Sequence, residues 1–180
     1  MTTYICILRG INVGGNKRIK MDALRQMFTE LGCTNVQTYI QSGNVVFNAS
    51  ETDIQALQKT ISDKIQETFG FEVPVLVLTA SEIAAAVSNN PYSTDLAKDP
   101  ATIHLTFLSH LPDNTLLDKI IPSNYLPDEF ICLEKVVYLH CPNGYGNTKL
   151  TNTFFENKLK VTATCRNLKT SMELAAMTNK

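Results

Sequence analysis

The sequence predicts an α+β fold of two tandem ferredoxin-like subdomains with a C-terminal helix. Residues 1–80 show the order β-α-β-β-α-β, and the same order returns over residues 101–180. A helix and a turn-rich connecting segment occupy 81–100. The 180 residues include 44% apolar side chains, enough to bury cores of this size. The two halves share this pattern but no residue-level identity, so the expected duplication is one of architecture.

The first half carries four predicted strands and two predicted helices. Gly32 and Gly70 follow the helices as C-terminal stops. Pro74 indicates that the last strand begins at a sheet edge. By apolar run and helical spacing, we expect strands over Thr3–Leu8, Val36–Ile40, Asn44–Asn48 and Val73–Leu78, and helices over Met21–Leu31 and Thr52–Phe69.

The second half repeats the order after a short helix. Pro122 closes one predicted helix, and Asn147 or Thr148 is the expected N-cap of the next. The expected strands are Thr102–Leu108, Phe130–Leu133, Val136–His140 and Val161–Thr164, and the expected helices are Ser81–Ser88, Thr115–Ile121, Thr148–Leu159 and Leu168–Met177.

Composition excludes several classes of protein. No apolar run reaches the roughly 18 residues of a membrane span, and the N-terminus lacks the sections of a signal peptide. The five cysteines are scattered without a C-x-x-C pair, which argues against a disulfide framework or a zinc site. We expect a cytoplasmic protein without metal or cofactor, and with no membrane partner.

The most informative segment is a glycine-rich, cationic loop that follows the first strand. Glycines let backbone N–H groups turn outward, and a helix N-terminus attracts anions. The segment does not match a phosphate-binding P-loop, because the lysine is one position late and an arginine stands where Ser or Thr is needed. The alternative is a surface loop whose glycines serve chain reversal. The candidate ligand-binding residues here are Arg9, Gly10, Asn12, Gly14, Gly15, Lys17 and Arg18, with Lys20 adding charge nearby.

Three further segments offer polar or cationic groups. The hairpin tip carries Gln41, Ser42 and Asn44, which are hydrogen-bonding candidates or simply turn formers. A second glycine-rich loop over 143–150 includes Lys149, and the entry to the last helix carries Arg166 and Asn167. Cations at a helix start oppose its dipole, and either a bound anion or an acidic neighbour would offset that cost.

Charge is unevenly distributed along the chain. Residues 1–25 carry five basic side chains against one acidic, and residues 149–180 carry six against two, although the net charge is −1. The middle of the chain is therefore acidic. If the two ends meet in space they form one cationic face. Alternatively, they complement the acidic middle or point to solvent on separate faces.

No catalytic constellation stands out. His104 lies in an apolar strand, His110 precedes a turn, and the adjacent His140 and Cys141 point to opposite faces of a strand. No catalytic residue is therefore assigned, and whether the protein is an enzyme stays undecided.

The motifs together resemble the bacterial family called domain of unknown function 1697. The resemblance rests on the blocks 8–15, 20–25 and 38–47 and on two later ones, Gly144 to Leu150 and Thr164 to Asn167. It implies an α+β fold of two ferredoxin-like subdomains and no established activity. Leu168 stands where the family often has a tryptophan, so no aromatic stacking role is expected there.

The leading functional hypothesis is binding of an anionic ligand, either a nucleotide-like metabolite or a nucleic-acid backbone. The sequence pI of about 6.3 favours a small anion over nucleic acid. The alternatives are a small transferase or hydrolase acting on a phosphorylated substrate, and a protein-interaction module. The oligomeric state is not predicted.

Overall fold

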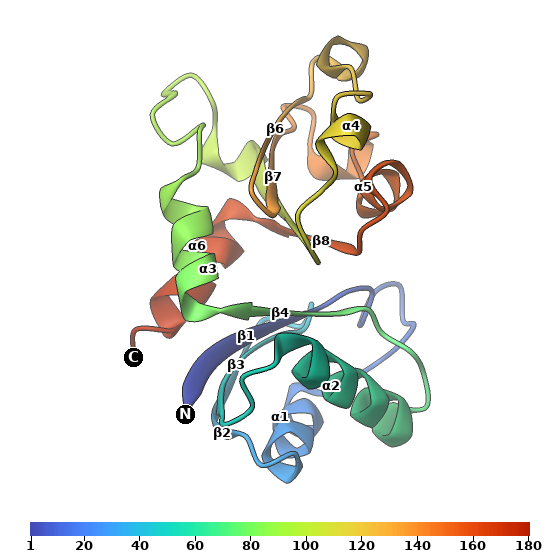
Figure 1. Ribbon diagram of the computed structural model, residues 1–180, viewed down its shortest axis with the longest axis vertical. Coiled ribbons are helices and arrows are strands. Elements are labelled where there is room, and N and C mark those ends of the chain that lie inside the picture. The colour runs from blue at the N-terminus through green and yellow to red at the C-terminus, as the bar shows by residue number, and fades with distance from the viewer. The chain divides into compact units, whose positions relative to one another are not determined.

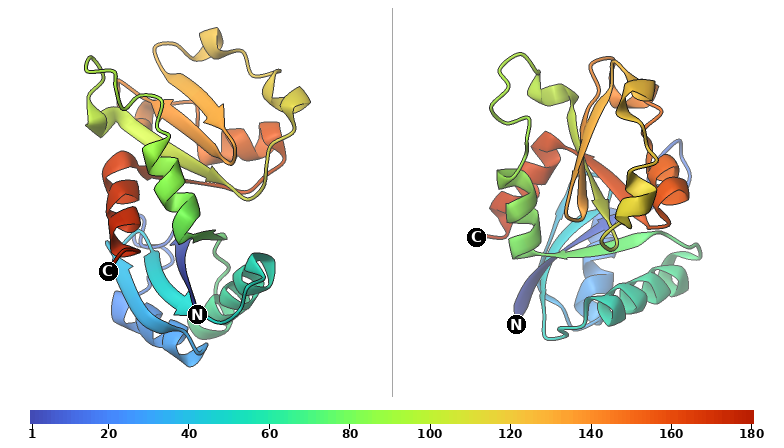
Figure 2. Two further views of the ribbon diagram at one scale, coloured as in Figure 1. Left: turned by 60° about the vertical axis from the view of Figure 1, so that its left-hand side comes forward. Right: turned by 45° about the horizontal axis from the view of Figure 1, so that its top comes forward.

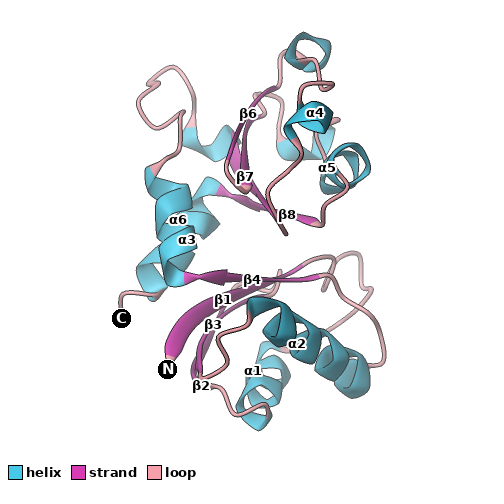
Figure 3. Ribbon diagram, in the orientation of Figure 1, coloured by secondary structure: helices cyan, strands magenta, loops and turns pink.

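The computed structural model describes all residues from Met1 to Lys180 and confirms the α+β class. The chain divides into two compact units, Met1–Ala84 with Leu174–Lys180, and Ala85–Glu173. Each unit contains one four-stranded antiparallel sheet, and the chain forms six α-helices (Figures 1 and 3). None of the helices combines the length and apolar character that crossing a lipid bilayer requires.

The first unit places two helices on one face of its sheet. The strand order is β2-β3-β1-β4, so β4 is an edge strand, as Pro74 predicts. The α1 helix packs near β2 and α2 near β4 (Figure 1). The elements are β1 (Thr2–Leu8), α1 (Met21–Glu30), β2 (Thr34–Tyr39), β3 (Asn44–Ala49), α2 (Ile54–Phe69) and β4 (Val75–Thr79).

The core of this unit forms between the sheet and its two helices. Tyr4, Cys6 and Leu8 alternate along β1 toward this core, where Phe28 meets Phe47 with ring centroids 4.9 Å apart. The intervening residues of β1 are also fully buried. Because both faces of β1 are buried, the strand reads in the sequence as a continuous apolar run instead of an alternating one.

The second unit repeats the order of elements. Its sheet has the order β6-β7-β5-β8, and its core joins that sheet to α5. α3 (Ala80–Ser88) precedes this repeat, and α6 (Leu168–Met177) follows it; Figure 2 shows both from two further directions. The other elements are β5 (Ile103–Leu108), α4 (Asn114–Leu117), β6 (Glu129–Leu133), β7 (Val136–His140), α5 (Asn152–Leu159) and β8 (Ala163–Asn167).

One hydrogen bond recurs at the edge strand of each sheet. In β4 the Val77 N–H donates to Gln58 Oε1 at 2.8 Å, and in β8 the Ala163 N–H donates to Glu156 Oε1 at 3.1 Å. Gln58 and Glu156 are each the fifth residue of the helix that precedes the strand. The two units therefore share a local stabilising contact as well as an order of elements.

Three predicted elements of the second unit are wrong in extent, and one of them is α4, which ends at Leu117 instead of Ile121. The helix expected over Thr148–Leu159 begins at Asn152, and its N-cap is Thr151 instead of Asn147 or Thr148. Thr148 has extended backbone and donates its hydroxyl to Asp128 Oδ2 at 2.7 Å, so it cannot enter the helix. The strand expected over Val161–Thr164 runs from Ala163 to Asn167, because β5 continues to pair with it.

The stability of the first unit should depend strongly on the absence of a side chain at Gly43. Its φ is +88°, and an added Cβ would lie 2.6 Å from Ile11 Cδ1 and 2.9 Å from Leu8 Cβ. We expect Gly43→Ala to lower the free energy of unfolding by about 2–4 kcal/mol, from backbone strain together with overpacking. Urea unfolding followed by circular dichroism measures this.

Gly14→Ala is the matched control for that variant. Gly14 also has a positive φ, +58°, but nothing lies within 4 Å of its added Cβ. It should cost only about 1 kcal/mol, the backbone strain alone. Equal losses in the two variants would show that close packing at Gly43 contributes nothing.

Candidate functional site

The glycine-rich loop between β1 and α1 folds back on itself. The Asn12 N–H donates to the Lys17 carbonyl at 3.1 Å, and Val13 pairs with Asn16 across the tip. The backbone takes positive φ at Gly10, Asn12, Gly14, Gly15 and Lys17. Such turns need glycine or tolerate asparagine, which explains the composition of the loop.

The Asn12 side chain fastens this loop to the β2–β3 hairpin. Its Nδ2 donates to the Ile19 carbonyl at 3.0 Å and to the Gln41 carbonyl at 2.8 Å, and its Oδ1 accepts from the Ile19 N–H at 2.9 Å. Both amide hydrogens are therefore used within the protein. The structure thus brings two predicted site segments together, and it gives Asn12 a positioning role there.

The cations of the loop are held without being neutralised. Lys17 Nζ donates to the Glu72 carbonyl at 2.7 Å, and Arg18 Nε donates to the Gly15 carbonyl at 3.2 Å. Both acceptors are uncharged carbonyl groups. None of Lys17, Arg18 and Lys20 forms an ion pair with a carboxylate, and all three side chains are exposed. The loop therefore presents uncompensated positive charge to solvent.

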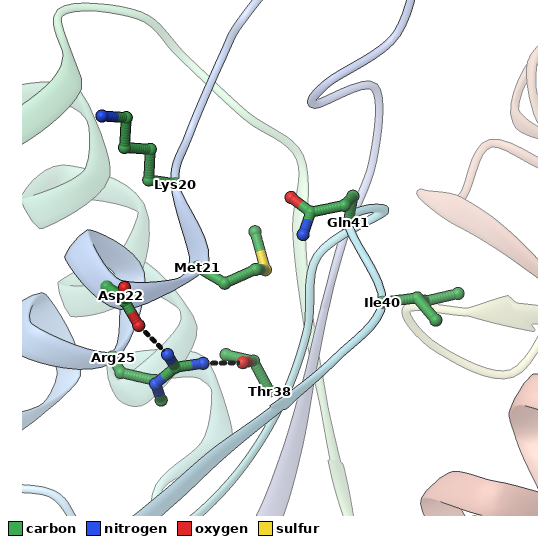
Figure 4. A pocket seen from close by; sticks show the side chains of 7 residues that line it. All are labelled: Lys20, Met21, Asp22, Arg25, Thr38, Ile40 and Gln41. Carbon is green, nitrogen blue, oxygen red and sulfur yellow. Dashed lines mark hydrogen bonds and ion pairs between the residues drawn. The ribbon is translucent and has the colours of Figure 1, made fainter.

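An open hollow of about 520 Å³ lies beside the loop, at the start of α1. Figure 4 shows Met21 between Lys20 and Gln41, with the Ile40 side chain pointing away from the others. No side chain caps the first N–H groups of α1. Those donors and the positive end of the helix dipole favour an anion. The lining residues are Lys20, Met21, Asp22, Arg25, Thr38, Ile40 and Gln41.

Arg25 is the cation of this hollow that sequence reasoning left out of the site. Its guanidinium donates to the Asp22 carboxylate and to the Thr38 hydroxyl (Figure 4). A guanidinium has five N–H donors, so these two bonds leave capacity for a ligand. The available signal was the spacing of Lys20, Asp22 and Arg25, which places all three near the first turn of one helix.

The hairpin tip combines an inward amide with an exposed, strained residue. Asn44 is fully buried and donates to the Tyr39 carbonyl at 2.9 Å and to Ser42 Oγ at 3.1 Å. This agrees with the turn-former interpretation of these two residues. Ile40 adopts φ +51°, which is unfavourable for a β-branched side chain, and is 48% exposed. Gln41 is the exposed polar group of the tip.

Two candidates of the second unit, Arg166 and Asn167, lie at the end of β8. Asn167 ends β8 and caps α6, since its Oδ1 accepts from the Thr170 N–H at 2.8 Å. Arg166 is half-buried and donates from Nη1 to the Cys165 carbonyl at 2.9 Å, while Lys149 is exposed. Ligand contact by Lys149, Arg166 and Asn167 stays a prediction.

Buried polar groups of the second unit serve its packing. The His104 ring stacks on Tyr145 with centroids 4.9 Å apart, and burial lowers the pKa of His104. Burial raises the pKa of Cys141 and Cys165 to about 11, so both remain thiols at neutral pH. No group of three His, Cys, Asp or Glu side chains is arranged to hold a metal ion.

Lys98 fixes the connection that follows α3. Its ammonium lies 3.0 Å from a Glu129 carboxylate oxygen, 3.6 Å from Asp95 Oδ2 and 5.5 Å from the Tyr92 ring centroid. The hydrogen bond to Glu129 raises the pKa of Lys98. These contacts anchor the segment to β6 and give it a structural role.

The fold and the loop define a two-unit α+β protein with a hydrogen-bonded cationic connection after its first strand. Residues 1–138 match the sequence family described as protein of unknown function (DUF1697), and the chain belongs to this family. Among solved structures it is similar to the conserved bacterial protein SP0830 from Streptococcus pneumoniae. That match has a TM-score of 0.75 and 24% identity over 100% of this chain and 99% of that one. No curated protein matches the chain.

Asn12→Asp tests the role of the Asn12 amide. The substitution keeps the shape but removes the two Nδ2 donors, and it sets a carboxylate against the carbonyls of Ile19 and Gln41. We expect the free energy of unfolding at pH 7 to fall by about 2–3 kcal/mol, with faster hydrogen exchange at Ile19. Hydrogen exchange and urea unfolding measure both effects.

The control is Asn16→Asp, which introduces the same charge at the exposed tip of the same loop. It should leave stability within about 0.5 kcal/mol of the wild type. A comparable loss in this control would mean that the added negative charge, and not the loss of the Nδ2 hydrogen bonds, lowers the stability of Asn12→Asp.

The partly or fully buried thiols of the second unit predict a loss of stability at high pH. In the unfolded chain cysteine titrates near 9.0, whereas the folded pKa of Cys132, Cys141 and Cys165 is about 11. Because the folded pKa is raised, the contribution is present in full below pH 9 and is lost between pH 9 and 11. Urea unfolding at a series of pH values should show that the free energy of unfolding falls across this range. Cys141→Ala should make this fall with pH less steep. If the fall is equally steep in Cys141→Ala, Cys141 does not contribute to it.

Proposed function

We propose that the β1–α1 loop and the adjoining hollow bind a small anionic ligand of the phosphate-bearing, nucleotide-like kind. The observation that supports it is the grouping of uncompensated cations, Lys17, Arg18 and Lys20, on a hydrogen-bonded loop beside the uncapped start of α1. Exposed cations without counter-charges attract an anion to this surface.

The length of the loop supports a role beyond connecting two elements. Residues 9–20 join β1 to α1, whereas residues 109–113 join β5 to α4 in the other unit. The connection from the central strand to the following helix therefore has twelve residues in the first unit and five in the second. The additional residues include Gly14, Gly15, Lys17 and Arg18, which are the residues of the cationic tip.

Each lining group has a chemical role in this proposal. Lys20 supplies charge inside the hollow, Arg25 offers the N–H donors that Asp22 and Thr38 leave open, and the first N–H groups of α1 supply directional donors. Gln41 supplies an amide that distinguishes among anions, and Met21 supplies an apolar surface. A small-molecule site typically combines an apolar surface with a few placed polar groups in this way.

The lining favours binding over acid–base catalysis. It contains no histidine, and its one carboxylate, Asp22, is paired with Arg25. A general base needs a free acceptor within reach of the substrate proton. A small transferase or hydrolase acting on a phosphorylated substrate, and a protein-interaction module, therefore remain the weaker candidates. A nucleic-acid backbone is the other anion that this surface would attract.

For the fold we propose two tandem ferredoxin-like subdomains, over residues 1–80 and 101–180, joined by the helix and connection of 81–100. The strand orders β2-β3-β1-β4 and β6-β7-β5-β8, each with the chain order β-α-β-β-α-β, support this assignment.

A thermal-shift and calorimetric screen tests the ligand class. The probes are inorganic phosphate, nucleoside mono-, di- and triphosphates, sugar phosphates and short single-stranded oligonucleotides, at low and moderate salt. We expect a nucleoside phosphate to bind, and Lys20→Gln to weaken that binding by about tenfold or more, as loss of a charge-assisted hydrogen bond does.

Lys59→Gln is the control, because it removes one exposed positive charge from α2 of the same unit. It should leave binding unchanged. Equal weakening in both variants would indicate a general charge effect and contradict a site at Lys20. Binding of oligonucleotides alone, lost steeply with salt, would replace the small anion with a nucleic-acid backbone. No binding by any probe would overturn the proposal and favour an interaction module.

A further inference from the structure

We propose that Asp22 competes with the ligand for Arg25 and thereby lowers the affinity of the hollow for highly charged anions. This inference rests on the proposed anion site and names the residue that decides which anions bind there well. It follows from the pairing of Asp22 inside the hollow, from the exposure of that pair, and from the second hydrogen bond of Arg25.

Asp22 is the one acidic side chain among the residues that line the hollow. Its carboxylate accepts a hydrogen bond from Arg25 Nη2, and the two residues lie three apart on α1 (Figure 4). The other charged group of the lining, Lys20, forms no ion pair with a carboxylate. Carboxylate and phosphate oxygens bind a guanidinium through the same charge-assisted hydrogen bonds. Asp22 therefore holds Arg25 as a phosphate group of a ligand would.

Asp22 also occupies a position in α1 that favours negative charge. It is the second residue of the helix, and no side chain caps the first N–H groups. A carboxylate in the first turn interacts favourably with the positive end of the helix dipole. A ligand anion is attracted to the same place and is repelled by Asp22 once it arrives. The carboxylate and the ligand thus compete for the helix start as well as for Arg25.

The ion pair is open enough to be exchanged. The Asp22 side chain is 91% exposed and that of Arg25 is 38% exposed. Exposed ion pairs contribute little to stability, because water screens them and two flexible side chains have to be held together. Asp22 can therefore turn into solvent at little cost when an anion takes its place on Arg25.

Thr38 keeps Arg25 in position during this exchange. Arg25 Nη1 donates to the Thr38 hydroxyl, which ties the guanidinium to β2 through a partner that carries no charge. This bond does not depend on Asp22, so it remains when the carboxylate leaves. A guanidinium that is already positioned loses less side-chain entropy on binding. The Thr38 hydroxyl accepts in this bond, and its own hydrogen can be donated to a ligand.

The effect of Asp22 depends on the charge of the ligand. A like charge a few ångströms away weakens the binding of a monoanion roughly threefold in water, and that of a dianion by about the square of this factor. A phosphomonoester carries close to two negative charges above neutral pH, whereas a phosphodiester carries one. Asp22 therefore disfavours a nucleoside monophosphate more than a cyclic nucleotide or a nucleic-acid backbone.

Calorimetric titration of the full chain at about pH 8 tests the proposal with adenosine monophosphate, a dianion there, and cyclic adenosine monophosphate, a monoanion. We expect Asp22→Asn to strengthen binding of the first probe about tenfold and of the second about threefold. Glu67→Gln is the matched control, because Glu67 forms an exposed ion pair with Lys64, three residues away on α2. The control should change neither affinity. Equal strengthening of both probes, or the same effect in the control, overturns the role of Asp22.

The outcomes separate this inference from the proposed function. If the wild type binds a probe and Asp22→Asn binds it no better, competition by Asp22 is overturned and the anion site stands. If Asp22→Asn alone binds, competition is supported and ligand binding by the wild type is overturned. If neither protein binds either probe, both proposals are overturned.

A double-mutant cycle tests whether Asp22 acts through Arg25. In an Arg25→Gln background Asp22 has no guanidinium to hold, so Asp22→Asn should strengthen binding of adenosine monophosphate clearly less than it does in the wild type. Circular dichroism confirms that both Arg25→Gln proteins are folded. An undiminished effect in this background would indicate a general charge effect and overturn the exchange at Arg25.

Discussion

The first unit depends on a single junction, where the β1–α1 loop crosses the β2–β3 hairpin. Gly43 makes room for this crossing, because Ile11 and Leu8 occupy the space that a side chain would need. Its carbonyl also accepts the Leu8 N–H at 2.8 Å. Asn12 closes the same junction with bonds to Ile19 and Gln41. Since the hairpin belongs to the sheet, these bonds connect the loop directly to the sheet.

At this junction, the polar groups that hold the loop in place are different from those that the loop exposes to solvent. Asn12, Ser42 and Asn44 turn their hydrogen bonds inward, so the exposed surface is left to cations and to Gln41. Lys17 and Arg18 are anchored to carbonyl oxygens, which restrict their positions without cancelling their charge. Pre-positioned charges lose less side-chain entropy on binding than mobile ones, which suits them to meet an anion.

The sequence predicted the order of elements and the cationic loop because both follow from local patterns. Apolar runs and helical spacing place β1, α1 and α2 within a few residues of their observed bounds. The start of α5 was wrong because Thr148 is held in an extended form by Asp128, twenty residues earlier in the chain. The bond of Asn12 to the hairpin was not predicted, because its partner Gln41 lies twenty-nine residues away. Neither contact can be recognised from neighbouring residues in the sequence, and the same is true of the hydrogen bond between Arg25 and Thr38.

A comparison of the two units explains why glycine is required at one junction only. In the first unit the N–H groups of Leu8 and Arg9 donate to the carbonyls of Gly43 and Pro74, and in the second those of Leu108 and Ser109 donate to Lys135 and Thr162. The two sheets thus close in the same way at the end of their central strands. In the second unit the chain then turns directly into α4, so a lysine fits where the first unit has Gly43. Glycine is needed in the first unit because its φ is +88° and because Ile11, at the base of the longer loop, and Leu8 of β1 pack over that position. The constraint at Gly43 therefore comes from the loop together with the backbone turn of this hairpin, since Lys135 has no positive φ.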